Sequence, residues 1–204
     1  MTIRFHRGDL PEDYAAGAAV AIDTETLGLN PHRDRLCVVQ LSGGDGNADV
    51  VQIVKDGPRP ERLARLLADP AVEKIFHFAR FDLGVLYHRL GVMPGPVYCT
   101  KIASKLTRTY SDKHGLKDLV RELLGVNLQK EQQSSDWGAE VLTPAQLEYA
   151  ASDVLHLHAL KEKLDLYLAR EGRTELARRC FEFLPTRARL DLAGWGDTDV
   201  FAHS

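Results

Sequence analysis

The sequence predicts an α/β fold, in which strand-like and helix-like segments alternate along 204 residues. Two observations carry this prediction. A short apolar run at residues 18–22 is followed by Thr24 and Thr26, which favour extended backbone. Residues 144–157 instead repeat apolar side chains at helical spacing. A chain of this length suits a single domain with a sizeable core.

The remaining elements follow from local signals. Residues 36–41 and 48–53 are apolar runs joined by a Gly-Gly-Asp-Gly-Asn segment, which predicts a hairpin turn rather than a phosphate loop. A helix is expected over residues 59–67 and a strand over residues 72–78. Most of the chain beyond this strand is expected to be helical.

The first chemical signal is an acidic pair at a strand end. Asp23 and Glu25 are two residues apart, so on a strand both side chains point to the same side. Two like charges on one face repel each other, and a bound metal ion would neutralise them. A solvated strand end is the alternative, and the tripeptide by itself does not decide between them.

Two more acids lie at element boundaries. Asp82 follows the expected strand that ends near His77, and helical periodicity begins near Ala79. An acid in a first helical turn can simply complement the helix dipole, and His77 fits either a strand end or a substrate cleft.

Tyr149 and Asp153 lie on a strongly helical stretch. Thr143 fits the N-cap, Pro144 the first helical position, and Gln146 the capping box. Residues four apart share a helix face, so Tyr149 and Asp153 face the same way. Packing of the tyrosine and pairing of the aspartate with a base is the alternative.

Together these segments resemble the three motifs of the DEDD exonuclease superfamily. Asp23 and Glu25 match the first motif, residues 77–82 the second, and Tyr149 with Asp153 the third. The tyrosine four residues before the last aspartate is typical of the tyrosine branch (DEDDy). Segments between the motifs, at residues 100–106, 114–119 and 133–137, resemble the ribonuclease D family.

This resemblance implies a fold, a domain division and an assembly. The implied fold is ribonuclease H-like, with a mixed central sheet flanked by helices and the carboxylates at one edge. Residues 1–185 would form the exonuclease domain, and residues 186–204 a C-terminal tail. The short form is similar to the nanoRNase C family, which degrades diribonucleotides. That similarity implies a homo-oligomer, with an octameric ring as one form, in which the apolar tail is buried between subunits; folding of the tail onto its own domain is the alternative.

The resemblance also implies two-metal hydrolysis from the 3′ end, giving nucleoside 5′-monophosphates. The implied ligands of two Mg²⁺ or Mn²⁺ ions are oxygen donors, namely Asp23, Glu25, Asp82 and Asp153. Tyr149 would orient the attacking water, because its ordinary pKa near ~10 argues against a free phenolate base. Candidate substrate contacts are Thr24, Leu27, Leu29, His77, Lys105, Ser134 and Ser135. Trp137, next to the serines, could stack on a base or anchor its loop.

Charge and composition bear on the substrate. The formal net charge is −3, so no overall basic surface for long nucleic acid is expected, although basic residues gather between the second and third motifs. This favours short RNA. Exonuclease action on longer RNA or single-stranded DNA, and a non-catalytic nucleic-acid-binding domain, stay as alternatives. Three widely spaced cysteines, no signal-peptide pattern and no membrane-length apolar run predict a cytoplasmic protein.

Overall fold

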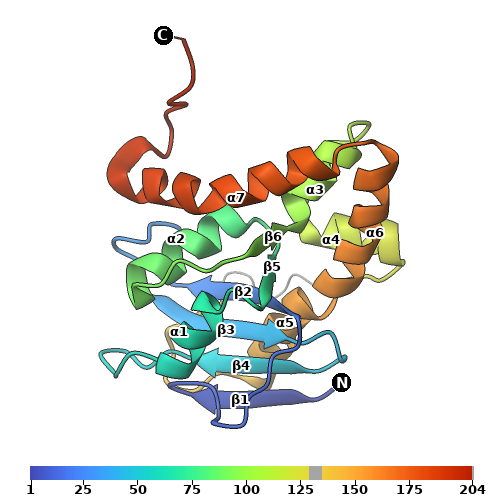
Figure 1. Cartoon of the computed structure of the whole chain (residues 1–204). Coiled ribbons are helices and arrows are strands. Elements are labelled where there is room, and N and C mark those ends of the chain that lie inside the picture. Colours follow the sequence, from blue (N-terminus) through green and yellow to red (C-terminus); the bar gives the residue numbers. More distant parts are fainter. Residues whose placement is uncertain (129–134, 204) are drawn as a thin grey trace.

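The computed structural model describes residues 1–128 and 135–203 and contains a six-stranded mixed sheet (Figure 1). The strand order across this sheet is β1-β4-β3-β2-β5-β6. Strand β2 pairs antiparallel with β3 and parallel with β5, so the predicted α/β class and mixed sheet are confirmed. The strands are β1 (Ile3–Arg7), β2 (Ala19–Thr26), β3 (Leu36–Ser42), β4 (Ala48–Gln52), β5 (Glu73–Phe76) and β6 (Val97–Cys99).

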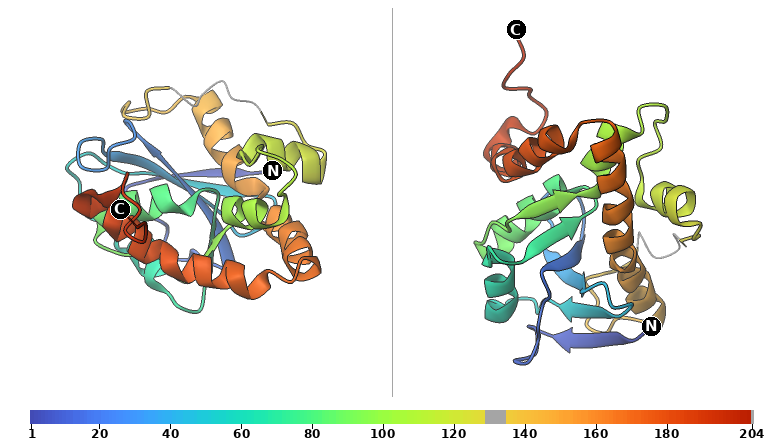
Figure 2. Two further views of the ribbon diagram at one scale, coloured as in Figure 1. Left: turned by 90° about the horizontal axis from the view of Figure 1, so that it is seen from above. Right: turned by 45° about the vertical axis from the view of Figure 1, so that its right-hand side comes forward.

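Helices cover both faces of the sheet. The helices are α1 (Glu61–Ala68), α2 (Ala79–Leu90), α3 (Thr100–Thr107), α4 (Leu116–Leu119), α5 (Pro144–Leu155), α6 (Leu157–Arg170) and α7 (Thr174–Leu190). Helix α5 lies across β1 to β4 on one face, and α1 and α2 lie on the other (Figure 2). Helix α7 crosses over α2, α3 and β6. Within the described part of the chain, no helix is both long and apolar enough to cross a membrane.

The sheet is buried most completely at its centre. Every residue of β3 and β4 is buried, because these strands lie between covered faces and therefore carry nearly continuous apolar runs. A smaller apolar cluster lies under α5 and includes Cys37, Val50 and Trp137. Burial of Trp137, which is 2% exposed, supports its role as a loop anchor.

Most local predictions are confirmed, and two strands were not predicted. β3 and β4 form the antiparallel hairpin, and Thr143 and Gln146 form the capping box that begins α5. β1 was missed because its sequence, Ile-Arg-Phe-His-Arg, carries no apolar run; it pairs with β4 at the edge of the sheet. β6 has only three residues and is recognisable only from its pairing with β5.

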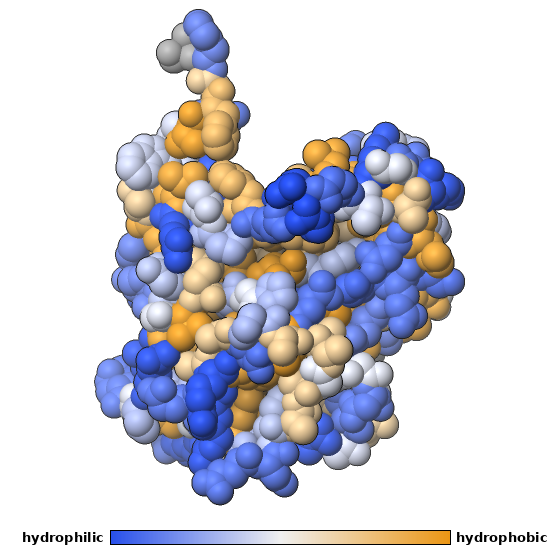
Figure 3. Space-filling view, viewed as in Figure 1, coloured by the Kyte–Doolittle hydropathy of each residue, from blue (hydrophilic) through white to orange (hydrophobic). Residues whose placement is uncertain are grey.

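The C-terminal segment stands partly apart from the domain. Helix α7 continues through Pro185, and a π-helical turn, η2 (Asp191–Trp195), follows it. Arg80 of α2 and Arg187 of α7 both bind the carboxylate of Asp191, which ties the turn to the domain. Beyond the turn the chain projects outward, and apolar surface lies at its base (Figure 3).

Candidate active site

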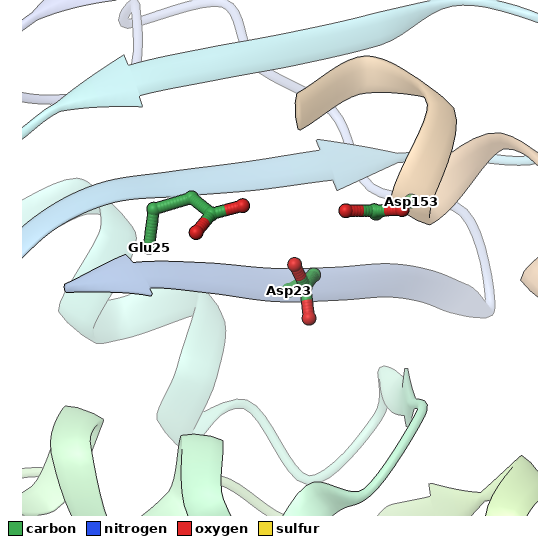
Figure 4. A group of neighbouring side chains, drawn as sticks. All are labelled: Asp23, Glu25 and Asp153. Carbon is green, nitrogen blue, oxygen red and sulfur yellow. The ribbon is translucent and has the colours of Figure 1, made fainter. Parts of the chain in front are cut away.

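Three of the predicted acids converge on one face of the sheet. Asp23 and Glu25 extend from β2, and Asp153 extends from α5 toward them (Figure 4). One carboxylate oxygen from each lies within 4.8 Å of the others. Strand alternation places the first two on one side, and the packing of α5 on β2 brings the third.

Neighbouring polar groups hold these acids in place. Gln40 lies directly across from Asp23 in the β2–β3 register, and its Nε2 donates to Asp23 Oδ2 at 2.7 Å. Thr24 Oγ1 donates to Asp82 Oδ1 at 2.7 Å, because Thr24 points to the opposite side of β2 from Asp23 and Glu25. Asp82 is thus linked to the acidic group through the backbone of β2. Asp82 is 2% exposed and is therefore more deeply buried than the three converging acids.

Burial and mutual repulsion make this cluster electrostatically unfavourable when all four acids are charged. Burial, followed by the charges of Asp82, Asp153 and Glu25, raises the pKa of Asp23 well above its ordinary value. Burial, with the charges of Asp153 and Asp82, raises the pKa of Glu25 to about 9. Burial raises the pKa of Asp82 and of Asp153 to about 7 each. Such a group needs either protons or cations as neutralising partners.

Tyr149 stands beside Asp153 at the edge of the cluster. It lies one helical turn before Asp153 on α5, and its ring packs against Trp137 with 6.0 Å between the ring centroids. Burial and the nearby charge of Asp153 raise the pKa of the Tyr149 hydroxyl above its ordinary value. The phenol is therefore protonated at neutral pH and can both donate and accept hydrogen bonds.

His77 lies between the end of β5 and the start of α2. Its Nδ1 is 2.9 Å from Thr100 Oγ1, and the Thr100 hydroxyl donates to the backbone oxygen of Phe76 at 3.2 Å. Burial, with the charge of Lys101, lowers the pKa of His77 to about 3, so the ring is neutral at neutral pH. Within residues 1–128 and 135–203, its buried Nε2 has no hydrogen-bond partner.

These groups line a cleft of about 360 Å³. Asp23, Glu25 and Asp153 form its acidic wall, and Tyr149 lines the cleft beside them. The remaining lining residues are Thr24, His77, Phe78, Lys101, Gly115, Leu116, Lys117, Asp118 and Leu128. The cleft therefore contains two lysines as well as the carboxylates, a combination that suits a phosphate group held near bound cations.

The predicted substrate contacts lie in different places relative to the cleft. Thr24 and His77 line the cleft. Lys105 is exposed one turn farther along α3 than Lys101 and does not line it, and Ser135 Oγ instead accepts a hydrogen bond from Gln146. Leu27 and Leu29 are 52% and 84% exposed on the loop that follows β2. Ser134 lies outside the described residues.

Several residues at the site are not among the candidate site residues expected from the sequence. Gln40 could have been noticed as a polar residue within an apolar strand, but its contact with Asp23 depends on strand register. Lys101 and Lys117 belong to the basic group between the second and third motifs. Nothing in the sequence distinguishes Phe78.

The acidic wall fits hard divalent cations. All of its donors are carboxylate oxygens, the ligands that Mg²⁺ and Mn²⁺ prefer, and the packing of α5 on β2 keeps them close together in spite of their repulsion.

The sequence of this chain is similar to those of an exonuclease family and of individual relatives. The 3′-5′ exonuclease family matches residues 4–169. A ribonuclease D of Granulibacter bethesdensis is 39% identical over 158 residues, which are 76% of this chain and 38% of that protein. A DNA polymerase I of Aquifex aeolicus is 38% identical over 169 residues, which are 81% of this chain and 26% of that protein. The chain spans about two fifths of the length of the ribonuclease D relatives it matches.

Solved structures of nucleases are similar to this chain over a larger part of its length than the sequence relatives are. Brucella melitensis NrnC with bound Mg²⁺ is 64% identical and has a TM-score of 0.94, and each chain is covered over 100% of its length. The same protein bound to pGG is 64% identical with a TM-score of 0.96, again over 100% of both chains. Escherichia coli RNase D is 28% identical with a TM-score of 0.74 over 84% of this chain and 45% of that one. The predicted ribonuclease H-like architecture is confirmed, and this chain belongs to the 3′-5′ exonuclease family, in the branch that contains ribonuclease D.

Proposed function

We propose that this protein is a metal-dependent 3′-5′ exoribonuclease that hydrolyses short oligoribonucleotides, diribonucleotides in particular, to nucleoside 5′-monophosphates. The observation that carries this proposal is the convergence of Asp23, Glu25 and Asp153 within 4.8 Å, beside Tyr149. Metal-dependent phosphodiester hydrolysis needs such a group of oxygen ligands around the reacting phosphate.

Asp23, Glu25 and Asp153 would hold the catalytic cations, and Asp82 would support them from beneath. Two Mg²⁺ or Mn²⁺ ions bound there would lower the pKa of a water molecule and stabilise charge on the attacking and leaving oxygens. Gln40 and Thr24 keep Asp23 and Asp82 in place through their hydrogen bonds.

Tyr149 would orient the attacking water. Its protonated hydroxyl lies in the cleft beside Asp153 and can accept a hydrogen bond from water or donate one to it. In the reaction the water oxygen bonds to phosphorus, the bond to the 3′ oxygen of the preceding nucleotide breaks, and that oxygen receives a proton. Lys101 and Lys117, which line the cleft, would pair with the phosphate.

Three observations favour a short substrate. The cleft measures about 360 Å³, at the small end of the range for small-ligand sites. Among the residues that the structure describes, two lysines line the cleft, whereas proteins that bind long nucleic acids carry extended basic surfaces. NrnC, similar to this chain over its full length, has been solved bound to pGG, a dinucleotide with a 5′ phosphate.

Exonuclease action on DNA is the second candidate. The similarity to a DNA polymerase I over 81% of this chain favours it. The two candidates share the acidic cluster and differ only in whether the site recognises a ribose 2′-hydroxyl. The neutral His77, with its unpartnered Nε2, is a candidate acceptor for such a hydroxyl.

We further propose that the protein forms a homo-oligomer through its tail, with an octameric ring as the form to test. Trp195, Val200 and Phe201 are 48%, 42% and 77% exposed on the projecting segment. Apolar side chains in such positions are typical of surfaces that bind another chain.

Divalent cations should stabilise the fold. Mg²⁺ at about 100-fold excess over its dissociation constant should raise the melting temperature of EDTA-treated protein by roughly 5–10 °C. Asp23→Asn should lose most of this increase, and it should be no less stable than wild type in EDTA because one repelling charge is gone. Glu140→Gln, which alters an exposed acid, serves as the control. An Mg²⁺-induced increase in Asp23→Asn equal to that of wild type would contradict the metal assignment.

Catalysis should depend on the acids and the tyrosine in different ways. Asp23→Ala and Asp153→Ala should abolish turnover with the fold intact. Tyr149→Phe should lower the single-turnover rate by ~10²-fold or more, because it removes one orienting hydrogen bond. The same variant should keep the thermal response to Mg²⁺, since the hydroxyl is not a proposed ligand. An unchanged single-turnover rate would leave Tyr149 with only its packing against Trp137.

Substrate length and sugar can be tested in one series. The wild-type protein is incubated with Mg²⁺ and 5′-labelled RNAs of two to about twenty nucleotides, alongside matched DNAs, with Asp23→Ala as the blank. We expect the diribonucleotide to be cleaved fastest and the matched DNA more slowly. Equal or faster cleavage of long RNA would establish a general exonuclease instead, and equal cleavage of DNA would favour the second candidate.

The tail should determine the assembly. Removal of residues 194–204 should lower the molar mass measured by light scattering to that of a smaller species, because the exposed apolar residues of the tail would be lost. Removal of residues 203–204 alone is the control and should leave the mass unchanged. An unaltered mass after the longer deletion would show that the tail does not hold subunits together.

A further inference from the structure

Two short segments supply the lysines that line the cleft. Lys101 belongs to α3, and Lys117 belongs to residues 115–118, all four of which line the cleft. Helix α4 has only four residues and continues into five residues of a π-helical turn, η1 (Val120–Leu124). A helix of this length is not stable by itself in water. The position of Lys117 in the cleft therefore depends on contacts from outside its own segment.

Arg108 connects these segments from inside the domain. It directly follows the last residue of α3, and its side chain is 0% exposed. Its Nη1 donates to Ser104 Oγ at 3.1 Å and to the backbone oxygen of Lys113 at 2.6 Å. Its Nε and Nη2 donate to the carboxylate of Glu122 on η1. One guanidinium thus binds α3, the segment that precedes α4, and η1 at the same time.

A second contact joins the same segments. Ser104 Oγ lies 2.8 Å from His114 Nδ1. Because a guanidinium can only donate, the Ser104 oxygen accepts from Arg108, which leaves its hydroxyl hydrogen to be donated to the imidazole. Partial burial, followed by the charge of Arg108, lowers the pKa of His114, so the ring is neutral at neutral pH and Nδ1 can accept. His114 is therefore fixed immediately before the residues that line the cleft.

The pairing of Arg108 with Glu122 controls geometry more than stability. The Glu122 side chain is 40% exposed, and its hydrogen bond with Arg108 lowers its pKa, so the carboxylate is ionised at neutral pH. Burial of a charged group costs free energy that its ion pair largely offsets, so the net gain in stability is small. A guanidinium nevertheless fixes the relative positions of the groups it binds, because its donors form a rigid planar fork.

We propose that Arg108 is a positioning residue for the substrate site, and that it determines the position of Lys117 relative to Lys101 by holding residues 113–118 against the end of α3. The inference rests on the proposed function and deepens it. Arg108 does not line the cleft, so it acts on the substrate only through the segments that it holds. Its loss should weaken binding of the substrate phosphate and leave the three converging acids, on β2 and α5, in place.

The test separates substrate binding from chemistry. Arg108→Met removes the guanidinium and keeps an unbranched stem, and Glu122→Gln alters the pair at its exposed end. We expect the KM for a 5′-phosphorylated diribonucleotide to rise by roughly 10- to 150-fold in Arg108→Met, the range of one charge-assisted hydrogen bond. It should rise by about threefold or more in Glu122→Gln, which keeps a weaker neutral hydrogen bond. The kcat and the Mg²⁺-induced increase in melting temperature should change much less.

Two further measurements report on position itself. Amide hydrogen exchange over residues 113–118 should become faster in both variants, whereas exchange in β2 should not change. If Arg108 acts by placing Lys117, the KM of the Arg108→Met/Lys117→Ala double variant should lie well below the product of the two single effects. Effects that multiply in the double variant would show that the two residues act independently and would overturn the inference.

A matched control is available at the same end of α3. Arg173 donates to the backbone oxygen of Leu106, in the last turn of α3, and comes from the N-terminal end of α7. Arg173→Met removes the same charge and should leave the KM unchanged.

The failure of this inference differs from the failure of the proposed function. A wild type that cleaves the diribonucleotide, with an unchanged KM in Arg108→Met and Glu122→Gln, would overturn the positioning role and leave the proposed function standing. If Arg108→Met does not fold, Glu122→Gln decides the outcome. A parallel loss of kcat and of the thermal response to Mg²⁺ in Glu122→Gln would assign the pair to folding of the whole domain and overturn the inference. An inactive wild type would refute the proposed function, and the inference with it.

Discussion

The repulsion among four clustered carboxylates, of which Asp82 is buried and the other three are half-buried, is the constraint on which the rest of the site depends. Asp23, Glu25, Asp82 and Asp153 come from a strand and two helices that pack on that strand. Their raised pKa values show that the fold brings them together against the electrostatic cost. The surrounding structure supplies the opposing free energy: β2 is central in the sheet, and α5 is fastened by its capping box and by Trp137. A rigid frame is therefore a precondition for the chemistry.

Much of this site could be predicted from local rules, and the rest depended on long-range contacts. Strand alternation correctly placed Asp23 beside Glu25, and helical spacing placed Tyr149 beside Asp153. The convergence of these pairs required the packing of α5 on β2, which no local pattern contains. Register likewise determines that Gln40 lies across from Asp23. The strands at the two edges were missed for the same reason, since β1 and β6 are recognisable only through their partners.

The sequence does not predict which of two neighbouring lysines on α3 lines the cleft. Lys101 and Lys105 are four residues apart on α3 and share a face, so charge and periodicity do not distinguish them. One helical turn advances the chain by about 5.4 Å, and that distance separates a residue in the cleft from one at the surface. Phe78 is a second example. Its left-handed backbone follows from the tight turn between β5 and α2, whereas its sequence neighbourhood resembles an ordinary strand end.

Several energetically unfavourable groups lie close together at the cleft, where a bound ligand would stabilise them. Besides the carboxylates, the described residues contain four buried polar atoms without hydrogen-bond partners, and two of these belong to Gln40 and His77. Phe78 adds backbone strain and an exposed ring at the same place. Under the proposed function, cations would neutralise the carboxylates and a substrate hydroxyl would bind the imidazole. The unfavourable groups are thus concentrated at one location, where metal ions would neutralise the carboxylates and a bound nucleotide would give His77 a hydrogen-bond partner.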